Sequence, residues 1–247
     1  MNGYVCQILE VPWLSHVQFR IDWLHCSDQG VGADALGNVF KVLASKQKGR
    51  NKTERVHGLW RRVQRYYSEN KVADKLPKLT VEMIQQSGKP PKLRGSAGCV
   101  RALVPCADMM CKELLSSTDP VESAIKSVAA TLCECYENLS SAKWDEDALP
   151  TNAIKFAHLY VALERHATAC FTKDSHDWHI KPKMHMFLEL CAEGSMPSKF
   201  WCYRDEDYGG TVAALAHHRG GPMTAHGMSV RVLDFFKVKQ QMVRIMQ

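Results

Sequence analysis

The sequence predicts a mainly α-helical fold with a small β component at its N-terminus. Three observations lead to this prediction. Between about residues 34 and 175, apolar residues recur at the three- and four-residue steps of amphipathic helices. The alternation of apolar and polar residues that is typical of a strand occurs only before that region. The chain has 247 residues, of which 45% are hydrophobic, so it can bury a sizeable core.

Two short strands are expected at the N-terminus, over Tyr4–Leu9 and His16–Ile21. In the second segment the residues at 17, 19 and 21 are apolar and their neighbours are polar, as in a strand with one buried face. Asp22 follows directly, so its side chain would stand at the end of this strand.

Helices are expected from residue 34 onward. Gly30 and Gly32 are predicted to break the chain, after which Asp34 caps a helix that ends before Gly49. The segment Thr53–Glu69 then places apolar residues on one helix face, with arginines interleaved between them. This segment is predicted to form an amphipathic, basic helix.

Proline and capping residues mark the boundaries of the later helices. Pro105 should bend a buried helix over Val100–Leu114. In SSTDPVES, Asp119 is predicted as an N-cap, with Pro120 at the first helical position and Glu122 completing a capping box. Helices are expected to run from Asp119 to Leu139, from Thr151 or Asn152 to Phe171, from Pro182 to Glu193, from Glu206 to His217, and from Met228 onward.

The basic residues are segregated along the chain. From Lys41 to Arg101 there are 16 Lys and Arg against 4 Asp and Glu, a local charge of +12 within a chain whose net charge is +6. Such a basic block suits a polyanion, and we expect DNA or RNA; a solvated helical surface is the alternative. The residues expected to contact nucleic acid are Arg55, Arg61, Arg62, Arg65, Lys89, Lys92 and Arg94.

Several classes of protein do not fit the sequence. It has no long uncharged apolar run and no N-terminal signal pattern, so an intracellular protein without a membrane span is expected. The ten cysteines lie at irregular intervals, which favours reduced, mostly buried thiols. The chain has neither a phosphate-binding glycine-rich loop nor a C-x2-C pair, so neither a nucleotide cofactor nor a zinc site is predicted.

Two acidic residues are candidates for metal-assisted chemistry. Cleavage of a phosphodiester with two metal ions needs carboxylates from separate elements, and Mg²⁺ prefers oxygen ligands. Asp22 after a strand and Glu206 on a late helix could be two such ligands. An Asp at the end of a strand can equally be a cap or turn residue.

Three segments together resemble motifs of the CACTA-type (En/Spm) DNA transposases. IDWLHCSDQGVGADALGNVFKVL resembles the family's D-x-M-H-N-x-x-x-G, IKPKMHMFLEL its P-N-x-H-L-x-x-H, and FWCYRDEDYGG its W-x-F-x-x-E-R-x-N-G. The matched residues are Asp22, His25 and Gly30 in the first segment, Pro182 and His185 in the second, and Trp201, Tyr203, Glu206 and Gly210 in the third.

The resemblance implies a DDE transposase, whose ribonuclease H-like α/β core is interrupted by a large helical insertion. By this resemblance residues 1–33 are a partial core segment, 34–175 the insertion, and 176–247 a C-terminal helical part of the core. Asp22 and Glu206 would be the second and third carboxylates that bind Mg²⁺ or Mn²⁺. His25, His185 and Trp201 would be supporting residues near the site.

The chain also departs from the family's pattern. The earliest Asp of a DDE core lies on its opening strand, and this chain begins too shortly before Asp22 to supply it. Asp207 and Gly209 stand where the family has Arg and Asn. We therefore expect a nuclear transposase fragment that is inactive alone, unless self-association or an upstream chain completes the core. The alternative is a non-catalytic, transposon-derived protein that binds nucleic acid or a protein partner through the basic block.

Overall fold

The computed structural model describes residues 19–170 and 176–218, together with residues 227, 230, 233 and 234. These residues are mainly helical, and no strand occurs among them. The chain divides into two compact units, Met1–Trp201 and Cys202–Gln247. Helix α8 (Tyr203–His218) belongs to the second unit.

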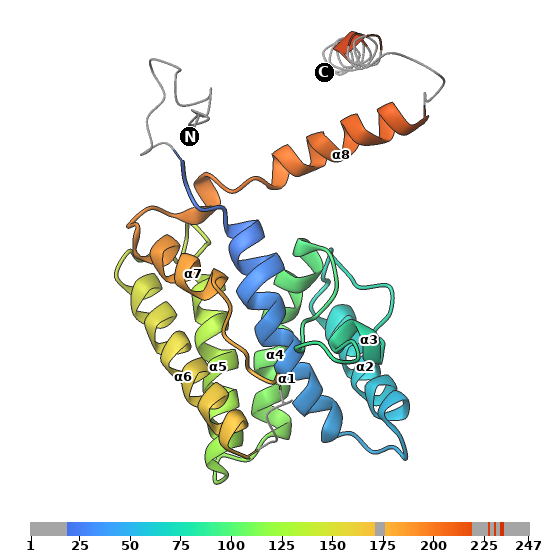
Figure 1. Ribbon diagram of the computed structural model, residues 1–247, viewed down its shortest axis with the longest axis vertical. Helices are drawn as coiled ribbons and strands as arrows, with labels where there is room; N and C mark the ends of the chain where they lie inside the picture. The colour runs from blue at the N-terminus through green and yellow to red at the C-terminus, as the bar shows by residue number, and fades with distance from the viewer. Residues whose placement is uncertain (1–18, 171–175, 219–226, 228–229, 231–232, 235–247) are drawn as a thin grey trace, which may run out of the picture. The chain divides into compact units, whose positions relative to one another are not determined.

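The described part of the first unit is a stack of helices around α1 (Figure 1). Its elements are η3 (Leu24–Val31), α1 (Gly32–Ser45), α2 (Lys52–Glu69), α3 (Val81–Ile84), α4 (Ala97–Leu114), α5 (Pro120–Glu137), α6 (Ala148–Cys170), α7 (Lys183–Ala192) and the short η4 (Pro197–Lys199).

Helix α1 lies at the centre of the first unit because nearly all of its surface is apolar or small. Every residue from 30 to 40 is buried. Helices α2 and α3 pack on one side of α1, and α4 and α5 pack on the other (Figure 1). At Gly37 the extended segment before α4 crosses α1 so closely that an added Cβ would lie 2.3 Å from the backbone nitrogen of Lys92. Only glycine fits at this crossing.

Helices α4, α5, α6 and α7 pack in sequence, and α7 returns to contact η3. Aromatic side chains fill the space where these helices meet. The Trp23 ring lies edge-on to Tyr136, with centroids 5.3 Å apart, and to Phe187, with centroids 5.7 Å apart. Phe156 of α6 also packs on Phe187, at 5.9 Å. These aromatic contacts join the N-terminal segment to α5, α6 and α7.

The segment between α6 and α7 is tied to α1 by polar contacts. The Lys41 Nζ lies 2.6 Å from the Asp177 carboxylate, and the Lys181 Nζ lies 2.6 Å from that of Asp34. Trp178 is buried, with a positive φ of 59°, a conformation that is uncommon for a residue other than glycine. The chain therefore crosses α1 in a fixed conformation before α7 begins.

The structure corrects the prediction for the start of α1. Asp34 does not cap this helix, because it lies in the first turn and its carboxylate accepts from Lys181. Gly30 and Gly32 do not break the chain into a loop either. Gly30 does interrupt the helix, with a non-helical φ of −115° and ψ of −108° at a kink, whereas Gly32 is helical. Residues 19–22 are not a strand; Tyr4–Leu9 and residues 16–18 lie outside the described residues.

The N-cap predicted for α5 is confirmed. Asp119 is the N-cap of α5, and its Oδ1 accepts from the backbone N–H groups of Val121 and Glu122, both at 2.9 Å. The reciprocal half of the box is wrong, because the Glu122 carboxylate accepts from the Ser116 N–H at 2.6 Å and pairs with Lys46.

Helix α6 begins earlier than predicted. It starts at Ala148, where the Asp145 carboxylate accepts from the Ala148 N–H at 3.0 Å, so neither Thr151 nor Asn152 is its cap. The helix predicted from Met228 onward falls almost entirely outside the described residues.

Candidate nucleic-acid interface and pocket

Asp22 caps the first helical turn of the described chain. Its Oδ2 accepts from the His25 backbone N–H at 2.9 Å and lies 2.7 Å from the His25 Nδ1. This is the geometry of an N-cap, which satisfies a backbone donor that has no partner within the helix. The structure therefore brings two predicted site residues, Asp22 and His25, into contact.

The other residues of the predicted metal site lie on different elements. His185 is exposed on α7, and its Nε2 lies 3.1 Å from the Glu189 carboxylate. Trp201 ends the first unit, and the Arg101 guanidinium stacks over its ring at 4.3 Å. Glu206 is exposed in the first turn of α8 in the second unit. A metal ion shared by Asp22 and Glu206 would join residues of both units, and it stays a prediction.

Helix α2 presents a basic face to solvent. Its apolar side, with Val56, Leu59 and Val63, is buried in the first unit. Arg61 and Arg65 are exposed on the opposite side, one helical turn apart. Helix α2 forms because Asn51 caps it, accepting from the Glu54 N–H at 2.9 Å, and because its apolar stripe recurs with helical spacing.

Two of the predicted contact residues, Arg62 and Lys92, make contacts within the fold. The Arg62 guanidinium donates to the Gln47 Oε1 at 3.2 Å and to the Glu113 carboxylate at 3.2 Å. The half-buried Lys92 donates from Nζ to the backbone oxygen of Gln29 at 2.7 Å. Burial lowers the pKa of the Lys92 ammonium below its usual value, because the charged form loses hydration.

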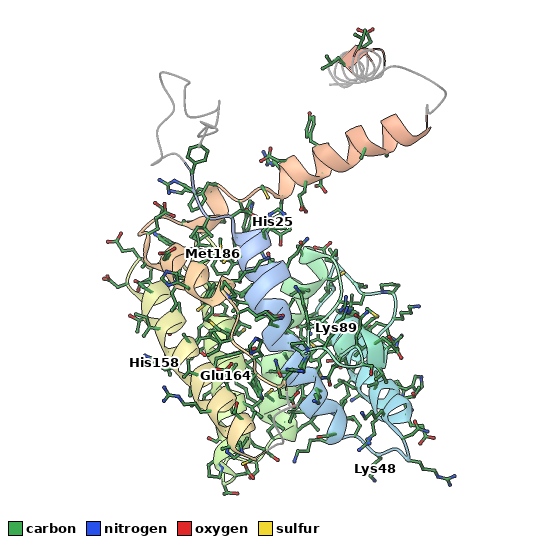
Figure 2. The ribbon with its side chains drawn as sticks, viewed as in Figure 1. His25, Lys48, Lys89, His158, Glu164 and Met186 are labelled. Atoms are coloured by element: carbon green, nitrogen blue, oxygen red, sulfur yellow. The ribbon has the colours of Figure 1, made fainter. Side chains whose placement is uncertain are left out.

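The segments that flank α2 and α3 carry further exposed cations. Figure 2 shows Lys48 in the loop between α1 and α2 and Lys89 in the loop after α3, both exposed. Arg94 is also exposed, just before α4. We call Arg61, Arg65, Lys48, Lys89 and Arg94 together the basic surface.

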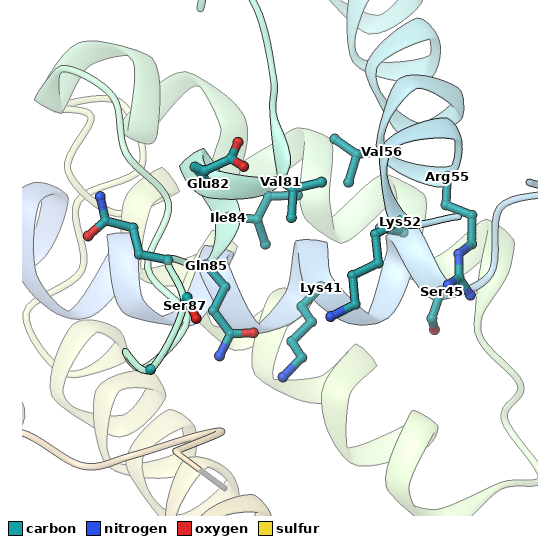
Figure 3. Close-up of a pocket in the computed structure, with 13 residues that line it drawn as sticks. Lys41, Ser45, Lys52, Arg55, Val56, Val81, Glu82, Ile84, Gln85 and Ser87 are labelled. Carbon is teal, nitrogen blue, oxygen red and sulfur yellow. The ribbon is translucent and has the colours of Figure 1, made fainter. Parts of the chain in front are cut away.

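A pocket with a volume of about 560 Å³ lies between α1, α2 and the α3 segment (Figure 3). Lys41, Lys52 and Arg55 contribute cations to its lining. Arg55 was predicted as a nucleic-acid contact, but the pocket itself was not predicted. Its lining comes from three short stretches of chain, residues 41–45, 52–56 and 81–88, and no motif or periodicity connects them.

The nine cysteines that the structure describes are free thiols, as predicted, and seven of them are buried. Burial raises the pKa of Cys106 and of Cys111 to about 12, because the thiolate would lose hydration. Such thiols are poor nucleophiles and poor metal ligands at neutral pH.

Among the described residues, no helix combines the length and the apolar character that crossing a membrane requires. Comparisons of the chain with protein-family models, with curated proteins and with solved structures gave no match.

Proposed function

We propose that this chain is a transposon-derived helical protein that binds the phosphate backbone of DNA or RNA through its basic surface. The observation that supports this proposal best is the placement of Arg61 and Arg65. Both are exposed on one side of α2, and within the described residues no carboxylate lies at ion-pair distance from either. The resemblance to CACTA-type transposases favours DNA and a nuclear protein.

Binding of this kind is driven by release of the counterions that surround nucleic acid. Each Lys or Arg that contacts a phosphate contributes about one unit to the slope of log affinity against log salt. The contacts carry no sequence information, because they reach phosphates and not base edges. The expected binding is therefore steeply dependent on salt and indifferent to sequence.

Reversing the two exposed arginines tests this function. With Arg61→Glu and Arg65→Glu combined, we expect the affinity for a duplex oligonucleotide to fall by more than about tenfold and the salt slope to fall by about two. Fluorescence anisotropy would measure both quantities. The titrations would cover about 50 to 200 mM salt, over which such binding changes steeply. Arg62 is left unchanged so that its contact with Glu113 is preserved. A loss of affinity in the double variant then does not result from the loss of this contact.

The matched control is Lys155→Glu combined with Arg165→Glu. Both residues are exposed on α6, and the change in net charge is the same. We expect this control to weaken binding much less, because it affects only the long-range field of the protein. Equal losses in the two double variants would show that net charge, and not α2, determines binding.

A second candidate function is metal-dependent DNA cleavage by a ribonuclease H-like core that an upstream chain or a second copy completes. The resemblance motivates it, and the contact between Asp22 and His25 favours it because a carboxylate and an imidazole there could share a divalent ion. In this candidate Asp22 and Glu206 would bind Mg²⁺ or Mn²⁺, which activates water and stabilises the leaving oxygen.

Conservative variants separate this chemistry from the capping role of Asp22. Asp22→Asn keeps an oxygen that can cap the helix but removes the carboxylate charge. Glu206→Gln removes the carboxylate charge on α8 and keeps a side chain of the same shape. We expect both variants to lose cleavage of supercoiled DNA in Mg²⁺ or Mn²⁺, whereas Asp205→Asn keeps it. Cleavage that persists in both variants, or is absent from the unmodified chain, would eliminate this candidate.

A further inference from the structure

The pocket between α1, α2 and the α3 segment has the size of a site for a small ligand. Its volume of about 560 Å³ falls in the range of about 300 to 1,000 Å³ in which ligand pockets usually lie. Its wall is partly apolar, with the half-buried Val81 from α3 together with two buried residues, Val56 of α2 and Ile84 of α3. A pocket that combines an apolar wall with a few charged groups favours a ligand of mixed polarity.

One end of the pocket is cationic. Figure 3 shows Lys41 and Lys52 reaching toward the same space, with Arg55 beside them on α2. Lys41 already pairs with the Asp177 carboxylate at 2.6 Å. Within the described residues, Lys52 and Arg55 have no carboxylate at ion-pair distance. These two cations could therefore bind an anionic group, and Lys52 also opens α2, where backbone N–H groups point outward.

The other end is rich in hydrogen-bond acceptors. In the view of Figure 3, Glu82 lies away from Arg55, on the far side of Val81. The Gln85 Nε2 donates to the Lys89 backbone oxygen at 2.9 Å. This bond fixes the amide and leaves its Oε1 as an acceptor. The Gln86 amide lines the same end. Hydroxyl or amino groups of a ligand would find partners there.

We infer that this pocket binds a nucleoside phosphate. The phosphate lies between Lys52 and Arg55, the base or sugar covers the half-buried Val81, and polar groups of the nucleoside donate to the Glu82 end. The ligand could be a free nucleotide or the 5′-phosphorylated end of a nucleic-acid strand; the second source rests on the function proposed above. Inorganic phosphate alone would leave the half-buried Val81 in contact with water, so the nucleoside should add affinity.

Titration of the full chain with AMP and UMP, followed by calorimetry, tests the inference directly. We expect Lys52→Gln and Arg55→Gln each to weaken binding by about tenfold, the usual effect of losing one charged hydrogen bond. Arg165→Gln is the matched control, because Arg165 is exposed on α6, outside both the pocket and the basic surface, and its replacement changes the net charge equally. Lys52 is exposed, so its variant tests the phosphate end even if replacing the half-buried Arg55 disturbs folding.

Short oligonucleotides with and without a 5′-phosphate distinguish the two sources. Tighter binding of the phosphorylated strand, lost in Lys52→Gln, would identify the strand end. Binding of AMP with no preference among the strands would identify the free nucleotide. The inference is overturned if none of AMP, UMP and the 5′-phosphorylated strand binds, if inorganic phosphate or an acidic peptide binds as tightly as AMP, or if Arg165→Gln loses as much as Arg55→Gln. Duplex binding through Arg61 and Arg65 could survive each of these failures.

Discussion

The side chain of Asn38 connects three parts of the first unit. Its Nδ2 donates to the Asp34 backbone oxygen at 2.9 Å and to the Tyr160 hydroxyl at 3.3 Å, and its Oδ1 accepts from the Trp178 N–H at 2.8 Å. Asn38 is buried, and the buried Trp178 N–H, which lies outside any helix, depends on its amide for a hydrogen bond. One residue thus holds α1, α6 and the segment before α7 in register.

Asn38→Ala should lower the free energy of unfolding by about 2 to 3 kcal/mol, because it leaves the buried Trp178 N–H without a partner. Guanidinium denaturation followed by circular dichroism would measure the change. Asn152→Ala is the control, since Asn152 is half-buried on α6 and its side chain makes no hydrogen bond to other described residues. A cost below about 1 kcal/mol at Asn38 would mean that water replaces the amide there.

For single helices, the sequence correctly predicted those N-caps that depend only on neighbouring residues. Asp119 and Pro120 begin α5 as expected, because a cap needs only its own neighbouring N–H groups. Asp34 and Glu122 are also acidic residues at the start of a helix and were predicted to cap it. Their carboxylates accept from the Lys181 Nζ and from the Ser116 backbone N–H instead. A residue 147 positions away in the chain cannot be recognised from the spacing around Asp34.

In the whole molecule, a feature carried by one helix could be predicted from the sequence, and a feature formed by several packed elements could not. The basic face of α2 could be predicted, because Arg61 and Arg65 lie on one helix with a regular period. The pocket could not, because its residues come from α1, α2 and the α3 segment, and only the packing of these elements brings them together.

The core of the first unit is rich in thiols, and their burial should lower the stability of the fold at alkaline pH. Burial raises the pKa of Cys26 and Cys133 to about 11 and of Cys106, Cys111 and Cys135 to about 12, from an ordinary value of 9.0. Above pH 9 the unfolded chain releases these protons and the folded chain keeps them. The unfolded state is therefore favoured progressively as the pH rises toward 12.

We expect the midpoint of guanidinium unfolding to fall steadily between pH 8 and pH 10.5 in the presence of a reductant. Each buried thiol removes up to about 1.4 kcal/mol per pH unit once its unfolded form ionises. Cys106→Ala should reduce this pH dependence, whereas Cys170→Ala should not, because Cys170 is exposed. A midpoint that stays constant over this range would contradict the assignment.

The central position of α1 also governs when the protein can fold during synthesis. Helix α1 is made early, but the residues that cover it include Leu93, Tyr160 and Trp178, the last of which leaves the ribosome much later. Until then its apolar surface has no complete partner in the growing chain. We therefore expect nascent chains that stop before Lys181 to stay bound to chaperones, and release to follow soon after that residue emerges.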